Sequence, residues 1–176
     1  MNDNYRQSPV FDSLKTAIAV LFSIVLSACS DKSKPIISDS SSIEMSQLVC
    51  QSASNYKDRV VGDGHCVSLI KWCSGAPPTK LWRAGAPVLT SDLPTGTVIA
   101  TFKNNRYPNH TGHHAAIYIR HDENGIWVWD QWVGKPVHQR LIRKRTDNAS
   151  AGNTAQAYRV VLIEDPISNS RYSRAN

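Results

Sequence analysis

An uncharged run near the N-terminus constrains this chain more than any other feature of its sequence. Residues 16–26 read TAIAVLFSIVL, eleven residues without a charge. A membrane-spanning helix needs about 20 apolar residues, so this run is too short to cross a bilayer and is instead typical of a secretory signal. It leads into Leu26-Ser27-Ala28-Cys29, which is typical of a bacterial lipobox, where the cysteine thiol takes a diacylglyceryl group. We expect residues 1–28 to be a lipoprotein signal peptide and Cys29 to be the lipidated first residue of the mature protein.

The alternative is an ordinary cleaved signal, or a short anchor in which Cys29 is coincidental, because the upstream acidic residues offset the basic ones. If the lipobox is used, Ser30 behind Cys29 is typical of lipoproteins sorted to the outer membrane of Gram-negative bacteria. This predicts a periplasmic protein anchored through Cys29, or a secreted one. Residues 29–42 are rich in serine and charge and indicate a flexible tether.

The remaining sequence has the length of one domain, which we place at residues 43–166, followed by a polar tail at 167–176. The whole chain is 41% hydrophobic and 19% charged, which excludes general disorder, and its net charge of +6 favours an anionic partner. We expect helices near residues 42–53, capped by Ser41 and Glu44, and near 65–73. Strands are expected near residues 97–102, 114–119, 126–130, 137–143 and 157–163. Helices followed by an antiparallel meander indicate an α+β fold.

The cysteine count points to one free thiol. Export implies an oxidising compartment, and lipidation of Cys29 leaves three of the four cysteines. Cys66 comes at the first turn of the second expected helix, where the helix dipole favours a thiolate, whereas Cys73 lies at its far end. We therefore predict a disulfide between Cys50 and Cys73, worth about 3 kcal/mol, and a free nucleophile at Cys66. A Cys50–Cys66 bond and a buried, inert Cys66 are the alternatives.

A thiol that attacks an amide needs a base, and the leaving amine needs an acid. His114 opens an expected strand and is the candidate for both roles. Asp130, on the next strand, is the candidate that orients the imidazole, but the simplest hairpin register leaves it short of His114, so a bulge or a different acid is needed. The backbone N–H of Cys66 is the natural oxyanion donor, and Tyr56 and Asp63 are candidates for a second donor.

Several separated blocks resemble known cell-wall amidases. The segments GDGHCVSLIK around Cys66 and HAAIY from His114 resemble CHAP-type amidases, which are related to NlpC-type peptidases. With PTGTVIATF and GIWVWDQW, they are similar to the second family of type VI secretion amidase effectors over roughly residues 46–163. The resemblance implies a papain-like fold and hydrolysis of peptidoglycan stem peptides, at the diaminopimelate–D-alanine cross-link in that family, without a metal or organic cofactor.

The same reading gives the expected ligands and partners. Peptidoglycan is the expected substrate, with Gly64, Tyr56 and Trp132 as candidate substrate-binding residues, and a cognate inhibitor protein is a further candidate partner. The family pattern selects His114 over the adjacent His113, since neighbouring strand residues face opposite sides. Effectors of this kind need no lipoprotein signal, so the lipobox departs from the family pattern.

Two other readings of the sequence compete with an enzyme. His110, His113, His114 and His121 could be zinc ligands, but adjacent histidines on a strand diverge. A cell-wall-binding lipoprotein without turnover could use its tryptophans as a platform for glycan rings. Nucleic-acid binding is disfavoured, because the chain has none of the usual motifs and carries an export signal.

Overall fold

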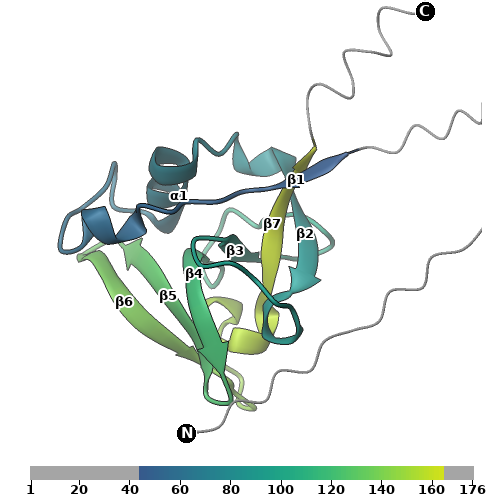
Figure 1. Ribbon diagram of the computed structural model, residues 1–176. Coiled ribbons are helices and arrows are strands. Elements are labelled where there is room, and N and C mark those ends of the chain that lie inside the picture. Colours follow the sequence, from purple (N-terminus) through teal and green to yellow (C-terminus); the bar gives the residue numbers. More distant parts are fainter. Residues whose placement is uncertain (1–43, 165–176) are drawn as a thin grey trace, which may run out of the picture. The chain divides into compact units, whose positions relative to one another are not determined.

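The computed structural model describes residues 44–164, which form one α-helix, short 3₁₀ turns and a seven-stranded antiparallel sheet (Figure 1). The described helix and strands are β1 (Met45–Gln47), α1 (Cys66–Ser74), β2 (Trp82–Pro87), β3 (Val98–Thr101), β4 (Ala115–Asp122), β5 (Gly125–Trp132), β6 (Lys135–Arg143) and β7 (Tyr158–Glu164). The predicted signal peptide, Cys29, nearly all of the tether and the tail lie outside the described residues. Within residues 44–164, no helix is long and apolar enough to span a membrane.

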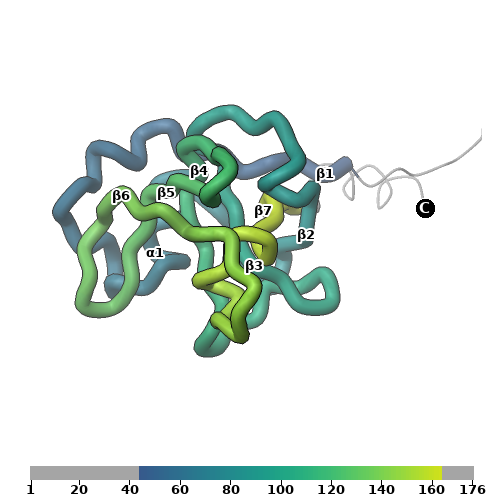
Figure 2. The backbone as a smooth tube through the Cα atoms, turned by 90° about the horizontal axis from the view of Figure 1, so that it is seen from below, coloured from purple at the N-terminus to yellow at the C-terminus, as the bar shows by residue number. Residues whose placement is uncertain are grey.

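Strand β7 lies between β2 on one side and β1 and β3 on the other. It pairs with β1 and β3 along one edge and with β2 along the other, and β3 continues through β4 and β5 to β6 (Figure 1). Strands β4, β5 and β6 are consecutive in sequence and linked by tight turns. The segment that returns the chain from β6 to β7 packs beside β3, as Figure 2 shows from below.

Side-chain alternation gives the sheet two apolar faces. On β4, Ala115 and Ile117 face the cluster that contains Leu69 and Ile70 of α1, whereas Ala116 belongs to the cluster on the opposite face. The latter cluster also contains Ile99, Tyr118, Ile126, Val128, Ile142 and Tyr158. Both faces of the sheet are therefore buried. Leu69 and Ile70 anchor α1 on one of these faces, and the N-terminal end of the helix lies beside β4.

The five expected strands and the second expected helix are present, with ends shifted by a few residues. The expected first helix at 42–53 is wrong. Residues 45–47 form β1, Val49 bridges to Thr97, and a 3₁₀ turn covers Ala53–Tyr56. The backbone N–H groups of Leu48 and Cys50 donate to the carbonyls of Val161 and Gly96. These acceptors, on β7 and in the turn before β3, replace the hydrogen bonds that a helix would have made, so tertiary contacts override the helical spacing of the side chains. Strand β2 was not expected.

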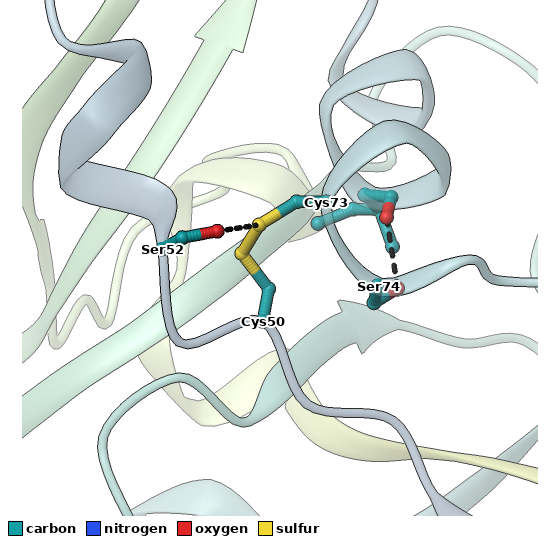
Figure 3. Close-up of a disulfide and its surroundings, with 5 residues drawn as sticks. Cys50, Ser52, Cys73 and Ser74 are labelled. Atoms are coloured by element: carbon teal, nitrogen blue, oxygen red, sulfur yellow. Dashed lines mark hydrogen bonds between the residues drawn. A yellow bond between two sulfur atoms is a disulfide. The ribbon is translucent and has the colours of Figure 1, made fainter.

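A disulfide joins Cys50 to Cys73, with the Cα atoms 5.4 Å apart (Figure 3). Cys50 follows β1 and is almost fully buried, and Cys73 is near the C-terminal end of α1. The Ser52 hydroxyl lies 3.6 Å from the Cys73 sulfur (Figure 3). The bond therefore fastens the end of α1 to the segment beside β7, which leaves the start of α1 to carry Cys66.

Replacing Cys50 and Cys73 together by alanine should lower the free energy of unfolding by about 3 kcal/mol, because the unfolded chain regains the entropy of an open loop. Urea denaturation measures the change, with Cys66→Ala as a control that keeps the disulfide. A double variant that unfolds at the same urea concentration as the control would contradict a stabilising bond.

Candidate active site

Cys66 is the free cysteine of the described chain, and it lies half-buried at the first residue of α1. The helix dipole and unpaired N–H groups of the first turn favour a thiolate at this position. The thiol lines a groove of about 800 Å³, formed by the start of α1, the loop between β3 and β4, and the β5–β6 turn. The nucleophile predicted from the sequence is therefore accessible to a substrate.

Two side chains hold the turn that delivers Cys66 to the groove. Asp63 accepts hydrogen bonds from the backbone N–H of His65 and from the Ser68 hydroxyl, which ties the turn before α1 to the first turn of the helix. Gln131, fully buried on β5, accepts from the N–H of Val61 at 2.9 Å and donates to the carbonyls of Val61 and His65 at 2.8 and 2.9 Å. All functional atoms of the Gln131 amide group are thus used to fix the backbone before the nucleophile.

His114, which is 9% exposed, lies beside Cys66 immediately before β4. Its Nε2 is 2.9 Å from Oδ2 of Asp130. The other ring nitrogen, Nδ1, is then left for the Cys66 thiol, which lines the same groove as His114. Gly152 packs so closely that an added Cβ would lie 2.9 Å from the Cβ of His114, so this position requires glycine. The three residues predicted as a triad are therefore in one connected arrangement.

A β-bulge brings Asp130 within reach of His114. The β4–β5 register shifts between Tyr118 and Arg120, so that Ile117 pairs with Trp129. Without the shift Trp129 would oppose Tyr118, and Asp130 would oppose Ile117 on the other face of the sheet. With it, Asp130 lies one residue further along β4 toward His114. Of the two possibilities left open from the sequence, a bulge or a different acid, the bulge is present at this hairpin.

Arg140 on β6 completes the electrostatics of the site. Asp130 is fully buried, and its Oδ2 accepts from Arg140 Nε at 2.9 Å and Nη2 at 2.6 Å as well as from His114. The guanidinium also stacks over the Trp132 ring at 5.2 Å. A buried carboxylate without such partners would be costly and would tend to take up a proton. Arg140 therefore keeps Asp130 ionised and fixes the oxygen that His114 uses.

These contacts set the protonation of the site. Burial opposes charge on all three groups, but their mutual interactions outweigh it. Hydrogen bonds to Asp130 and Cys66 raise the pKa of His114 to about 9, and the hydrogen bond and charge of His114 lower the pKa of the Cys66 thiol. His114 and then Arg140 lower the pKa of Asp130. The arrangement favours a thiolate–imidazolium pair near neutral pH.

Tyr107 is a fourth side chain at the thiol, and sequence reasoning missed it. Its hydroxyl lies 3.6 Å from the Cys66 sulfur, and it reaches the groove from the loop between β3 and β4. The second oxyanion donors considered from the sequence do not fit. The pKa of Asp63 is lowered by its Ser68 and His65 hydrogen bonds, so its carboxylate can only accept, and Tyr56 packs against the core outside the groove lining.

The candidate substrate-binding residues differ in whether they line the groove. Trp132 lines the groove and is partly exposed. Gly64 is buried in the turn with a φ of +80°, outside the groove lining, where it serves the backbone rather than a substrate. His113 also lines the groove, with its Nδ1 3.0 Å from the Thr101 hydroxyl. Among residues 44–164, no three His, Cys, Asp or Glu side chains converge to hold a metal ion.

The model of the domesticated amidase effector 2 family matches residues 39–161, which is more than half of the chain. The chain belongs to this amidase effector family. It is 43% identical over 116 residues to a type VI secretion amidase effector 2 protein from Salmonella typhi, covering 57% of this chain and 87% of that protein. It is 38% identical over 104 residues to domesticated amidase effector 2 from Ixodes scapularis, covering 53% and 70%.

A solved structure of type 6 secretion amidase effector 2 has the same fold. The two superpose with a TM-score of 0.60 at 36% identity, covering 67% of this chain and 96% of that chain. This confirms the α+β, papain-like fold and the family resemblance stated from the sequence. Membership of an amidase effector family makes the chain a hydrolase of amide bonds.

Replacing Arg140 by methionine should lower the free energy of unfolding by about 3 kcal/mol, because it strands the buried Asp130 charge. The matched control is Arg120→Met. Arg120 likewise bonds an aspartate, Asp122, and stacks 5.1 Å from a tryptophan, but its side chain is 57% exposed, so the loss should be below about 1 kcal/mol. Urea denaturation compares the two variants, and equal losses would contradict the assigned role of Arg140.

Proposed function

We propose that this protein is a cysteine amidase that hydrolyses amide bonds in peptidoglycan stem peptides or their cross-links. One observation carries the proposal: a free thiol at a helix N-terminus lies beside an imidazole that is bonded to a buried, ionised carboxylate. The family of amidase effectors supports the reaction class. The assignment of Cys66 as nucleophile, His114 as base and acid, and Asp130 as orienting group is our own.

The first half-reaction forms an acyl-enzyme. The Cys66 thiolate attacks the amide carbonyl carbon, and the C=O electron pair moves onto oxygen to give a tetrahedral oxyanion. When the oxyanion collapses, the C–N bond breaks and the imidazolium of His114 gives its proton to the leaving amine. The products are a thioester on Cys66, a free amine and a neutral His114.

The second half-reaction restores the thiol. Neutral His114 takes a proton from water, the hydroxide adds to the thioester carbon, and collapse of the second oxyanion breaks the C–S bond. The carboxylic acid product leaves, and the proton returns the pair to thiolate and imidazolium. Asp130, held by Arg140, keeps the same His114 nitrogen directed at the reacting atoms throughout both steps.

The polar lining of the groove supports a peptide with free carboxylates as substrate. Lys71 supplies an ammonium group to this lining, and Asp63, its acidic side chain, already accepts two hydrogen bonds. Stem peptides carry free carboxylates, which such a lining can bind. Trp132 adds a partly exposed apolar surface at the same groove.

The location is part of the same proposal. We place the enzyme in the periplasm, anchored through Cys29 by a tether at 29–42, with the catalytic domain at 43–166. The support is the lipobox-like sequence and the serine-rich segment that follows it. A cognate inhibitor protein is a further proposed partner, as expected for effector-like amidases.

Incubation with purified sacculi tests the reaction. The wild-type protein should release new muropeptide fragments, identified by mass, and Cys66→Ala should abolish their release while its circular dichroism and urea midpoint stay close to the wild type. Full activity of Cys66→Ala would falsify the mechanism. Binding of sacculi by the wild type without any new fragment would instead establish the cell-wall-binding alternative.

The pH dependence tests the ion pair. The thiolate exists above the lowered pKa of Cys66 and the imidazolium below the raised pKa of His114, so kcat/KM should fall as the pH rises through about 9. Asp130→Asn removes the largest interaction that raises the His114 pKa, so its alkaline limit should move to lower pH. An alkaline limit that stays in place in this variant would contradict the role given to Asp130.

A further inference from the structure

We propose that the Tyr107 hydroxyl is the second oxyanion donor of this enzyme, acting together with the backbone N–H of Cys66. This inference rests on the proposed amidase function and assigns a catalytic residue to it. Of the two donors considered from the sequence, Tyr56 packs against the core outside the groove lining, and the Asp63 carboxylate, whose pKa is lowered, has no proton to donate.

The surroundings of Tyr107 hold its ring in one position. The side chain is 9% exposed, and its ring packs against Trp82 with centroids 5.3 Å apart and edge-on to Phe102 at 6.5 Å. The residue follows a tight turn in which Lys103 and Arg106 exchange backbone hydrogen bonds. A donor fixed before the reaction needs no reorganisation when charge develops, which is the basis of oxyanion stabilisation.

The hydroxyl is directed at the reacting sulfur. The Cys66 sulfur, at 3.6 Å, is the hydrogen-bond partner of the Tyr107 oxygen within the described residues. During the reaction the carbonyl carbon is bonded to this sulfur, so its oxygen forms one bond away from it. A donor at this distance from the sulfur can lie within about 2.7–3.1 Å of the oxyanion, the range found for such donors.

Tyr107 stays protonated over the working pH range. Burial, and then the negative charge of Cys66, raise the pKa of its phenol far above the ordinary value. A phenol that keeps its proton can donate to an oxyanion but cannot compete with His114 as a base. Its position and its protonation therefore suit the same role.

A second role for the hydroxyl has to be separated from this one. The hydroxyl could simply stabilise the Cys66 thiolate before substrate binds. Its hydrogen bond lowers the pKa of Cys66, but it ranks below the contributions of His114 and the Ala115 backbone. Removal of the Tyr107 hydroxyl should therefore have little effect on formation of the Cys66 thiolate and a large effect on stabilisation of the oxyanion.

The experiment compares Tyr107→Phe with Tyr118→Phe in the full chain. Both variants lose one hydroxyl, and that of Tyr118 bonds to His121 Nδ1 at 2.8 Å, on the hairpin of β4. Two quantities are measured across pH: kcat and kcat/KM for fragment release from sacculi, and the rate at which iodoacetamide alkylates Cys66. Tyr107→Phe should lower kcat and kcat/KM about 10²-fold at every pH. The pH profile of alkylation should keep its midpoint, and Tyr118→Phe should match the wild type in both.

Three outcomes overturn the inference. Unchanged kcat in Tyr107→Phe excludes a catalytic role, and recovery of kcat at higher pH together with a raised alkylation midpoint assigns the hydroxyl to thiolate stabilisation. If Tyr107→Phe does not fold, a fluorinated tyrosine at position 107 replaces it, and kcat should rise with the acidity of the phenol. The third overturning outcome is a kcat that does not change with the acidity of the phenol. A wild-type protein that releases no fragments would instead defeat the proposed function itself.

Discussion

The buried charge of Asp130 is the constraint on which the rest of the site depends. A carboxylate with no exposed surface must be paired, and here His114 and Arg140 bond to the same oxygen. One partner comes from the start of β4 and the other from β6, so the pairing needs the whole β4–β5–β6 meander in register. The same pairing sets the imidazole of His114 toward Cys66. Stability of the sheet and orientation of the base therefore arise from one interaction.

Strand β5 supports the base and the nucleophile with successive residues. Side chains alternate along a strand, so Asp130 and Gln131 point to opposite faces. Asp130 holds His114, while Gln131 holds the carbonyls of Val61 and His65 in the turn before Cys66. A shift of one residue along β5 would exchange the two and leave both partners unsupported. The placement of both groups therefore depends on the register of β5, including the bulge that sets it against β4.

Much of this arrangement could be predicted from the sequence, for reasons that are local. Cys66 behind a glycine-containing turn and His114 at the start of a strand are signals carried by neighbouring residues, and the five strands have the periodicity of two that a sheet requires. The expected helix at 42–53 failed because β7 and the turn before β3 supply backbone partners that no local pattern reveals. Arg140 is not singled out as a site residue by the sequence, although it alternates with His138, which pairs with Asp130, and therefore shares a face with it. Tyr107 gave no local signal, because only the packing of Trp82 and Phe102 directs it to the thiol.

The disulfide makes the stability of the domain depend on the redox state of the compartment that contains it. In a reducing cytosol, Cys50 and Cys73 remain thiols, and the end of α1 is not fastened to the segment beside β7. A newly made molecule would then be easier to unfold, to keep open for translocation and to degrade. Oxidation after export would complete the fold and at the same time leave Cys66 as the single unprotected thiol of the domain.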